Sequence, residues 1–323
     1  MRTPRSLVAA TMTAALVAGC GSSDDDAGGA WTYTDDRGEE ISLEARPERL
    51  VVQSTLASAL SDYGIDVVAT FGPLRTEGGE VDPQVEGLDV DSVEDVSGSS
   101  EMGGFAFEKL AETEPDLIVS NMYVPPELWY VPADEEQKAA ELAPTLGLDF
   151  SESTLPEVLE RVEKLAVALG ADLDSEQVHD GQLAFDEASD RLRSVAEGLD
   201  GQQILFASAT DELLYLAGPG AFADVDHYRS LGLPIVQAEA SAGSPWEELS
   251  WENADKYPAD IVVWDSRIPE AQRESAQDQP AFRTLAAARE DAYVDWAAVT
   301  PPSPAGYARV MDRLADALEP YAD

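Results

Sequence analysis

Cysteine and histidine are scarce in this chain, and their scarcity excludes several kinds of site. The 323 residues include one cysteine, Cys20, and two histidines, His179 and His227. A single cysteine cannot form a disulfide within the chain. Two histidines far apart in sequence are a poor basis for the nitrogen and sulfur ligands that zinc prefers. We therefore expect neither a disulfide-stabilised fold nor a site for a bare metal ion.

Sequence patterns typical of enzymes are missing as well. No serine lies in a G-x-S-x-G nucleophile elbow, and the glycines at 218 and 220 are not followed by the lysine of a phosphate-binding loop. Carboxylates are numerous, but no pair of them is set apart by its pattern. We expect no catalytic residue and no cofactor, with a secreted hydrolase as a less favoured alternative.

Basic residues are few, and lysine is the rarer of the two. Lys and Arg number 20 against 64 Asp and Glu, which gives a formal net charge of −44. Such an excess of negative charge excludes nucleic acid as a partner, because the phosphate backbone would be repelled. It favours neutral or cationic ligands over polyanions.

The chain has no apolar run long enough to cross a membrane. The longest, residues 7 to 18, follows Arg2 and Arg5 and is shorter than the 20 or so residues that a span needs. It is typical of a secretory signal peptide. Its end, Val17-Ala18-Gly19-Cys20, resembles the bacterial lipobox, in which the cysteine is acylated. We expect a signal peptide over 1–19 and a lipid anchor on Cys20, with an ordinary signal peptide and an incidental cysteine as the alternative.

The remaining chain alternates strands with helices. A polar tether over 20–30 is followed by a hairpin-like opening, then by apolar runs that read as strands, each followed by an amphipathic stretch. Thr154 and Glu157 have capping-box spacing at the start of a helix that Gly170 ends. Strands resume with ILFASA, LLYLA, LPIVQA, DIVVW and AYVDW. We expect an α/β fold with lobes over 31–153 and 171–323. Each lobe has a mostly parallel sheet with flanking helices, and a single long rigid helix, 154–170, joins them.

A faint internal repeat supports two lobes. Phe107-Glu108 is followed, eight residues after the glutamate, by an aspartate that opens the run DLIV. Trp251-Glu252 is followed at the same distance by an aspartate that opens DIVV. Each lobe thus contains an aromatic–Glu pair ahead of a buried strand, although chance could produce such a match in an α/β protein.

These features together resemble the substrate-binding lipoproteins of ABC importers for ferric siderophores and cobalamin. The resemblance rests on WTYTDDRGEEISLEARPERLVV, FEKLAETEPDLIVS, the linking helix and WENADKYPADIVVW. It implies two lobes bridged by a rigid helix, a ligand in the cleft between them and little movement on binding. It also implies that Glu108 and Glu252 dock onto arginines of the membrane permease. The alternative is that each glutamate is simply favoured by the dipole at the start of a helix.

Ligands of parallel α/β sheets bind beyond the carboxyl ends of the strands, which directs attention to the loops there. These include 53–55, 72–75, 121–130, 218–222, 264–267 and Trp296. Aromatic side chains suit the arms of a siderophore, and arginines suit its iron-binding oxygens. The candidate ligand contacts are Arg75, Tyr123, Trp129, Tyr130, Trp264 and Arg267.

The expected function is therefore capture of a ferric siderophore by a monomer and its delivery to an ABC permease, on the extracytoplasmic face of the cell membrane. Cobalamin and haem are alternative ligands. The negative charge favours a neutral or cationic complex, such as a ferric hydroxamate, over ferric citrate. A structural surface lipoprotein is disfavoured because the chain lacks the serial repeats and stalk-like composition of such proteins.

Overall fold

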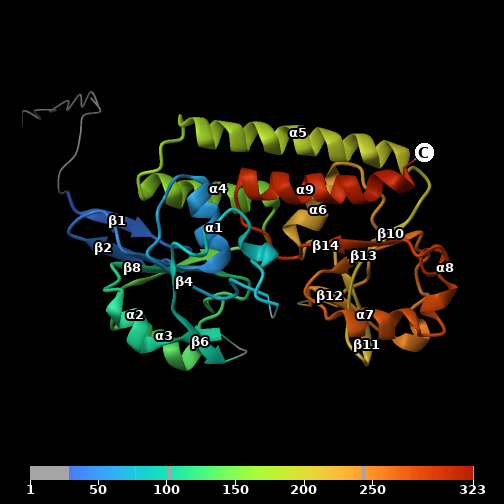
Figure 1. The fold of residues 1–323 in the computed structure, drawn as a ribbon, viewed down its shortest axis with the longest axis horizontal. Helices are drawn as coiled ribbons and strands as arrows, with labels where there is room; N and C mark the ends of the chain where they lie inside the picture. Colours follow the sequence, from blue (N-terminus) through green and yellow to red (C-terminus); the bar gives the residue numbers. More distant parts are fainter. Residues whose placement is uncertain (1–28, 77, 101–102, 242–243, 323) are drawn as a thin grey trace, which may run out of the picture.

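The computed structural model describes residues 29–76, 78–100, 103–241 and 244–322, so the expected signal peptide, Cys20 and most of the tether lie outside the described residues. The described chain forms two lobes, each built on a five-stranded sheet (Figure 1). Within the five-stranded sheet of the first lobe every strand pairing is parallel. The strand order is β5 (Glu94–Asp95), β4 (Ala69–Phe71), β3 (Leu50–Gln53), β8 (Leu117–Met122) and β9 (Thr145–Asp149).

The sheet of the second lobe is mixed. Its strand order is β12 (Trp246–Ser250), β11 (Leu213–Ala217), β10 (Ile204–Ala209), β13 (Ile261–Asp265) and β14 (Tyr293–Trp296). β10, β13 and β14 pair in parallel, whereas β11 pairs antiparallel with both β10 and β12. Only residues 210–212 separate β10 from β11, too few for the crossover that a parallel pair needs. The expected strand LPIVQA is present only as an isolated bridge between Ile204 and Ile235.

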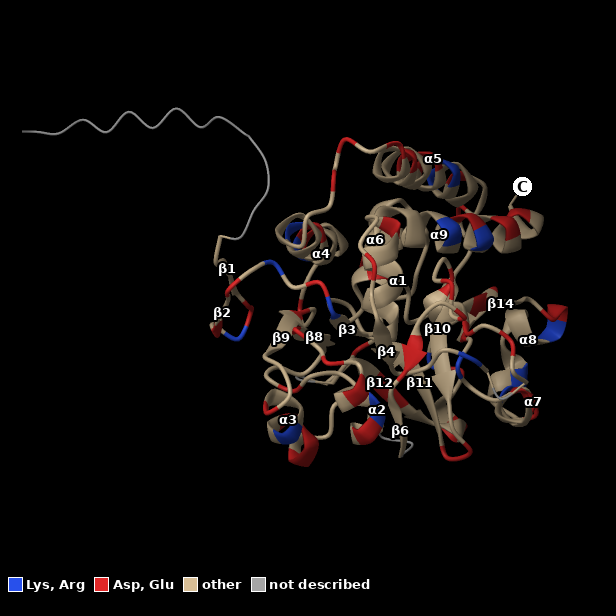
Figure 2. Cartoon of the chain, turned by 60° about the vertical axis from the view of Figure 1, so that its left-hand side comes forward, with Lys and Arg blue, Asp and Glu red and all other residues tan. Residues whose placement is uncertain are grey.

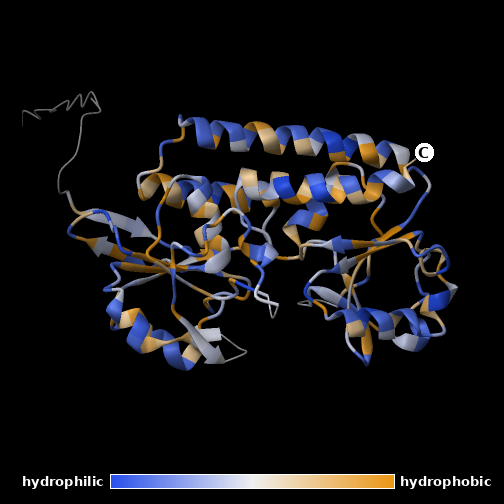
Figure 3. Cartoon of the chain, in the orientation of Figure 1, coloured by the Kyte–Doolittle hydropathy of each residue, from blue (hydrophilic) through white to orange (hydrophobic). Residues whose placement is uncertain are grey.

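The central strands are buried because helices cover both faces of each sheet. β3, β8 and β13 are buried along their whole length, as near-continuous apolar runs predict for parallel strands. Figure 3 shows hydrophobic residues concentrated in the strands of each lobe, with mixed character on the outer helices. The covering helices are α1 (Ser54–Asp62), α2 (Phe107–Glu112), α3 (Ala133–Ala140), α6 (Ala223–Ser230), α7 (Glu270–Gln277) and α8 (Ala286–Glu290), with short 3₁₀ turns η1 (Pro83–Val85), η2 (Trp251–Asn253), η3 (Phe282–Thr284) and η4 (Glu319–Tyr321).

Two successive helices connect the lobes. The helix expected over 154–170 is α4 (Leu155–Ala168), and Glu157 closes its capping box by accepting a hydrogen bond of 2.8 Å from the Thr154 backbone N–H. Gly170 follows its end, and α5 (Glu176–Gly198) then begins. α5 has 23 residues and runs from above the first lobe to above the second (Figure 1). The expected α/β fold of two lobes with a long linking helix is therefore confirmed.

The last helix, α9 (Pro304–Leu318), lies beside α5 and ties the second lobe to the first (Figure 1). The Arg309 guanidinium lies 3.1 Å from an oxygen of Asp62 at the end of α1 and donates 2.9 Å to the Glu86 carbonyl. Ser303 also donates to Asp62, and Arg313 pairs with the Glu86 carboxylate. Figure 2 shows the Arg residues of α9, in a chain whose charged residues are mostly Asp and Glu.

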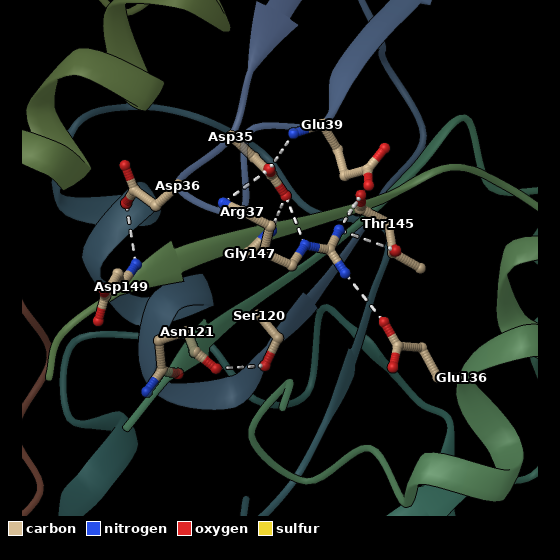
Figure 4. A network of polar contacts seen from close by, with 10 residues as sticks. All are labelled: Asp35, Asp36, Arg37, Glu39, Ser120, Asn121, Glu136, Thr145, Gly147 and Asp149. Carbon is tan, nitrogen blue, oxygen red and sulfur yellow. Dashed lines mark hydrogen bonds and ion pairs between the residues drawn. The ribbon is translucent and has the colours of Figure 1, made fainter. Parts of the chain in front are cut away.

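A hairpin at the start of the described chain is fixed to the edge of the first sheet. β1 (Trp31–Thr34) pairs antiparallel with β2 (Glu40–Leu43), as the opening sequence predicts. Asp35 in its turn accepts hydrogen bonds from the Gly147 backbone at 2.9 Å and from Arg37 Nε at 2.7 Å (Figure 4). Arg37 in turn reaches the Thr145 carbonyl and the Glu136 carboxylate. A second hairpin, β6 (Ser97–Ser100) with β7 (Gly103–Phe105), lies beside β4.

None of the helices within the described residues combines the length and the hydropathy that a membrane span requires.

Candidate functional site

Tyrosines that follow the first sheet approach an arginine that follows the second. The positive charge of Arg267, just after β13, acts on the pKa of both Tyr123 and Tyr130, which come from the segment after β8. Desolvation raises the pKa of Tyr123 to about 12, Arg267 opposes that rise, and Asp224 of the second lobe adds to it. Tyr123 keeps 39 % of its surface exposed, so part of its side chain is available to a ligand. Three candidate contacts from the two lobes therefore lie within electrostatic range of one another.

The segment after β8 presents a small aromatic cluster. Tyr123 and Trp129 meet edge to face with ring centroids 4.9 Å apart, and Trp129 meets Tyr130 at 5.4 Å. The two prolines at 125 and 126 prevent a regular element, and the chain doubles back through a bridge between Val124 and Glu127. The backbone N–H of Trp129 then donates to the Asn121 carbonyl at 2.8 Å, which fixes the position of the returning chain.

A glycine allows Tyr130 to pack where it does. Gly103 has φ +92°, and a Cβ there would lie 2.6 Å from the Tyr130 carbonyl oxygen and 2.8 Å from its Cα. The backbone of β7 can therefore approach the segment only because position 103 lacks a side chain. The neighbouring Gly104 N–H donates to the same carbonyl at 2.8 Å. Tyr130 has φ +61°, in the left-handed region that residues other than glycine rarely adopt. The hydrogen bond from Gly104 to its carbonyl helps to hold this conformation.

A buried carboxylate fixes Arg267 in position. Asp265 is 2 % exposed, and its oxygens accept from Arg267 Nε at 2.9 Å and from an Nη at 2.7 Å. The Arg267 backbone N–H also donates to Asp265 at 3.0 Å. A bidentate pair of this kind holds the guanidinium in one orientation. Because 40 % of the arginine side chain stays exposed, its outer face is available to a ligand.

The second lobe adds an aromatic wall. Phe222, ahead of α6, lies with its ring centroid 4.6 Å from that of Trp246 and 5.1 Å from that of Trp296. Phe222 lies in a loop that the sequence predicted to be at the ligand-binding edge, and Trp296, the last residue of β14, was predicted there as well. Trp296 is buried, whereas Phe222 and Trp246 are half-buried.

Asp224 was missed by sequence reasoning. It is 6 % exposed, and its Oδ2 accepts 2.7 Å from the indole N–H of Trp296. Burial raises the pKa of the Asp224 carboxyl to about 6. Burial also raises the pKa of Tyr307 on α9, and the negative charge of Asp224 and then the phenol of Tyr123 add to this effect. Asp224 therefore lies among groups of both lobes. Its only sequence signal was its place just beyond the nominated loop 218–222.

Two candidate contacts lie elsewhere. Trp264 is 1 % exposed and packs in the core of the second lobe with its ring 5.6 Å from Phe282, so it offers no surface to a ligand. Arg75 is exposed and pairs with Asp91 at 2.6 Å, and no described contact joins it to Tyr123, Tyr130 or Arg267.

The candidate docking glutamates are both exposed, one on each lobe. Glu108 lies in the first turn of α2, and Glu252 lies in η2. The backbone N–H of Glu252 itself and the hydroxyl of Ser250 lower the pKa of the Glu252 carboxyl. The start of a helix lowers the pKa of a carboxyl in this way, so the lowered pKa of Glu252 does not distinguish a helix-capping role from a docking role.

Two cavities flank these residues without containing them. One of about 590 Å³ is lined mainly by the second lobe, including Ser266, Trp296 and Arg313, and Pro83 of the first lobe borders it. The other, of about 560 Å³, lies at the outer edge of the first lobe beside Arg37, which is already paired. We place the site at Tyr123, Tyr130 and Arg267 because residues of both lobes carry its chemistry. Within the described ranges, no three metal-ligating side chains gather.

Known proteins share this architecture. Residues 79–299 match the family described as "Periplasmic binding protein". The structure of DesE, a ferric-siderophore receptor protein from Streptomyces coelicolor, is 32 % identical with a TM-score of 0.79, covering 90 % of this chain and 98 % of that one.

Other solved structures are more distant in sequence and share the fold. FhuD2 from Staphylococcus aureus is 20 % identical with a TM-score of 0.61, covering 86 % of this chain and 100 % of that one. PiuA from Streptococcus pneumoniae is 17 % identical with a TM-score of 0.66, covering 90 % and 97 %. A comparison with curated proteins finds no significant match. Because the family match spans more than half of the chain and DesE is 32 % identical over nearly its whole length, this chain belongs to the periplasmic binding protein family.

Proposed function

We propose that this protein is the extracytoplasmic substrate-binding component of an ABC importer, and that it captures a ferric siderophore between its lobes and delivers it to the membrane permease. The observation that carries the proposal is that Tyr123 and Tyr130 of one lobe lie within electrostatic range of Arg267 of the other. Phenols and indoles suit the arms of an iron chelate, and a guanidinium suits its iron-binding oxygens. The 32 % identity with DesE, a ferric-siderophore receptor protein, supports the same ligand class.

The proposed ligand contacts are Tyr123, Trp129, Tyr130 and Arg267. Trp264 supports the site from within the core of the second lobe, and Arg75 stays outside it while paired with Asp91. Cobalamin and haem are less favoured. Histidine, a common axial ligand of haem iron, is not among the proposed contacts, and His227 stacks on Phe185 with ring centroids 5.6 Å apart.

The remaining parts of the proposal concern the membrane. Residues 1–19 serve as a signal peptide, Cys20 carries the lipid, 20–30 is the tether, and the lobes 31–153 and 171–323 stand outside as a monomer with 154–170 in the connection. Glu108 and Glu252, exposed on separate lobes, dock onto permease arginines. One carboxylate per lobe would let the permease contact both lobes at once.

A binding titration tests the ligand class. The full chain, solubilised in a mild detergent, is titrated with ferric hydroxamate, catecholate and citrate complexes while its tryptophan fluorescence is followed, with calorimetry as a check. Iron-free chelators, cobalamin and haem are the controls. Saturable binding that requires iron, at a micromolar Kd or below, supports the proposal. A folded protein that binds none of the iron chelates refutes it.

Transport tests the docking glutamates. In cells that depend on the importer, Glu108→Lys and Glu252→Lys should each reduce uptake while the Kd of the isolated protein for its ligand stays unchanged, because a reversed charge opposes an arginine on the permease. Exposed Glu160→Lys, on α4, is the matched control. Uptake at the level of the control would refute docking through these residues. Cys20→Ser should release the protein from the membrane fraction, and retention there would refute the anchor.

A further inference from the structure

Asp224 differs from the other buried acids of the described chain. Four Asp and Glu residues are buried there: Asp35, Asp224, Glu247 and Asp265. Three of them have a cation within ion-pair distance, namely Arg37, Lys256 and Arg267. No Lys, Arg or His among the described residues pairs with Asp224, whose one side-chain donor is the indole N–H of Trp296 at 2.7 Å. A buried carboxylate without a counter-charge is costly, so it calls for an explanation.

The position of Asp224 connects it to the cleft. It lies in the first turn of α6, directly after the loop 218–222. Its partner Trp296 belongs to the aromatic wall with Phe222 and Trp246. Its charge acts on the phenol of Tyr123, which comes from the opposite lobe and keeps much of its surface exposed. The carboxylate is therefore buried behind this aromatic wall and within electrostatic range of Tyr123.

The nearby arginine does not balance this charge. Arg267 is the cation that faces Tyr123 and Tyr130, and Asp265 already neutralises it through a bidentate pair. Together these three groups, Asp265, Arg267 and ionised Asp224, leave one negative charge beside the cleft. Because Asp224 is buried, water screens its charge less, and such a charge discriminates between ligands more strongly than the same charge on the surface.

We propose that Asp224 is a specificity-determining residue that makes the cleft select iron chelates of zero or positive net charge, with a protonated amine on the chelate as the preferred counter-charge. This inference rests on the proposed function and names the charge class of its ligand. Arg267 then contacts the iron-binding oxygens as a hydrogen-bond donor, and Asp224 attracts the cationic end of the same ligand. Trianionic ferric chelates are disfavoured by the same field.

Three ligands that share one iron centre provide the test. A linear ferric trihydroxamate with a free terminal amine carries a charge of about +1 at neutral pH, its acetylated form is neutral, and its succinylated form carries about −1. Calorimetry on the full chain in detergent should give affinities that fall in that order, with a spread of about tenfold or more between the first and the last. Asp224→Asn should reduce the spread to about threefold or less, mainly by weakening the amine-bearing complex.

Two controls separate the effect of Asp224 from the overall negative charge. Asp200→Asn makes the same change in net charge at an exposed turn beyond the far end of α5, and it should leave the spread unchanged. The second control uses the native chain and needs no variant: the spread should persist in 0.5 M salt, because salt screens exposed charges more than buried ones.

The outcomes distinguish the two proposals. Equal affinity of the native chain for all three ligands would overturn the role of Asp224 and leave siderophore binding intact. A spread that collapses in high salt, or that Asp200→Asn reduces as much as Asp224→Asn, would overturn it in favour of the overall charge. Failure of the folded native chain to bind any ferric chelate would instead refute the proposed function.

Discussion

Replacing Asp224 with asparagine should stabilise the protein at neutral pH and have much less effect in acid. Burial raises the pKa of this carboxyl from its ordinary value of 3.8 to about 6. A raised carboxyl pKa means that the native state binds the proton more tightly than the unfolded chain does. The ionised carboxylate therefore destabilises the native state fully above about pH 6, and this cost fades as the pH falls towards 3.8. The pKa difference corresponds to about 3 kcal/mol at neutral pH.

The pH dependence is the sharp part of this prediction. Asparagine retains an acceptor for the Trp296 indole but loses part of the bonding to the backbone of Val225, so the absolute gain is smaller than 3 kcal/mol. The lost hydrogen bonding lowers the stability of the variant equally at neutral and at acid pH, whereas the cost of ionising Asp224 is present mainly at neutral pH. The stability of Asp224→Asn relative to the native chain should thus be about 2 kcal/mol more favourable at pH 7.5 than at pH 4.

Urea denaturation of both proteins at the two pH values, followed by tryptophan fluorescence, measures this difference. Asp200→Asn, which replaces an exposed aspartate, should show little change between the two pH values. A relative stability of Asp224→Asn that is the same at pH 7.5 and pH 4 would contradict the assignment of Asp224 as a buried, uncompensated charge.

Three further substitutions test the architecture around the site. Asp35→Ala should destabilise the protein by about 3 kcal/mol in urea, because Arg37 and the Gly147 N–H lose their buried acceptor; a loss below about 1 kcal/mol would show that the β1–β2 hairpin contributes little. Gly103→Ala should weaken ligand binding by about tenfold in a fluorescence titration, because its Cβ would displace the Tyr130 backbone; an unchanged Kd would refute this close approach. Arg309→Gln should lower the free energy of unfolding by about 2 kcal/mol, and combining it with Asp62→Asn should cost less than the sum of the two, whereas additivity would mean that this pair does not couple the lobes.

The sequence predicts the backbone of this fold well where one physical cause dominates. Apolar, β-branched runs gave the central strands because helices bury both of their faces. The Thr154–Glu157 spacing gave the start of α4 because a capping box depends only on local bonds. The segment 121–130 could be nominated because two prolines exclude a regular element there and the parallel strand before it ends at the ligand-binding edge.

Side-chain direction and pairing could not be read from the sequence in the same way. Trp264 and Arg267 are three residues apart at the end of β13, yet the tryptophan turns into the core and the arginine turns toward Tyr123. A strand buried on both faces has no alternation to reveal which side a residue takes. Asp224 was invisible for a different reason. In a chain with 64 acidic residues, burial of one carboxylate leaves no trace in the pattern.

The contacts of α9 bear on how the cleft can discriminate between ligands. This helix carries Tyr307, whose pKa is raised in part by the charges of Asp224 and Tyr123. Two residues further on, Arg309 forms an ion pair with Asp62 of the first lobe. Opening the lobes by rotation would have to break the contacts of Arg309 with Asp62 and Glu86 or move α9 together with the first lobe. The same helix thus sets both the spacing of the lobes and the surroundings of the uncompensated carboxylate. Selection by charge in such a cleft follows from a preformed arrangement of Asp224, Tyr123 and Arg267, because the ligand does not have to assemble it.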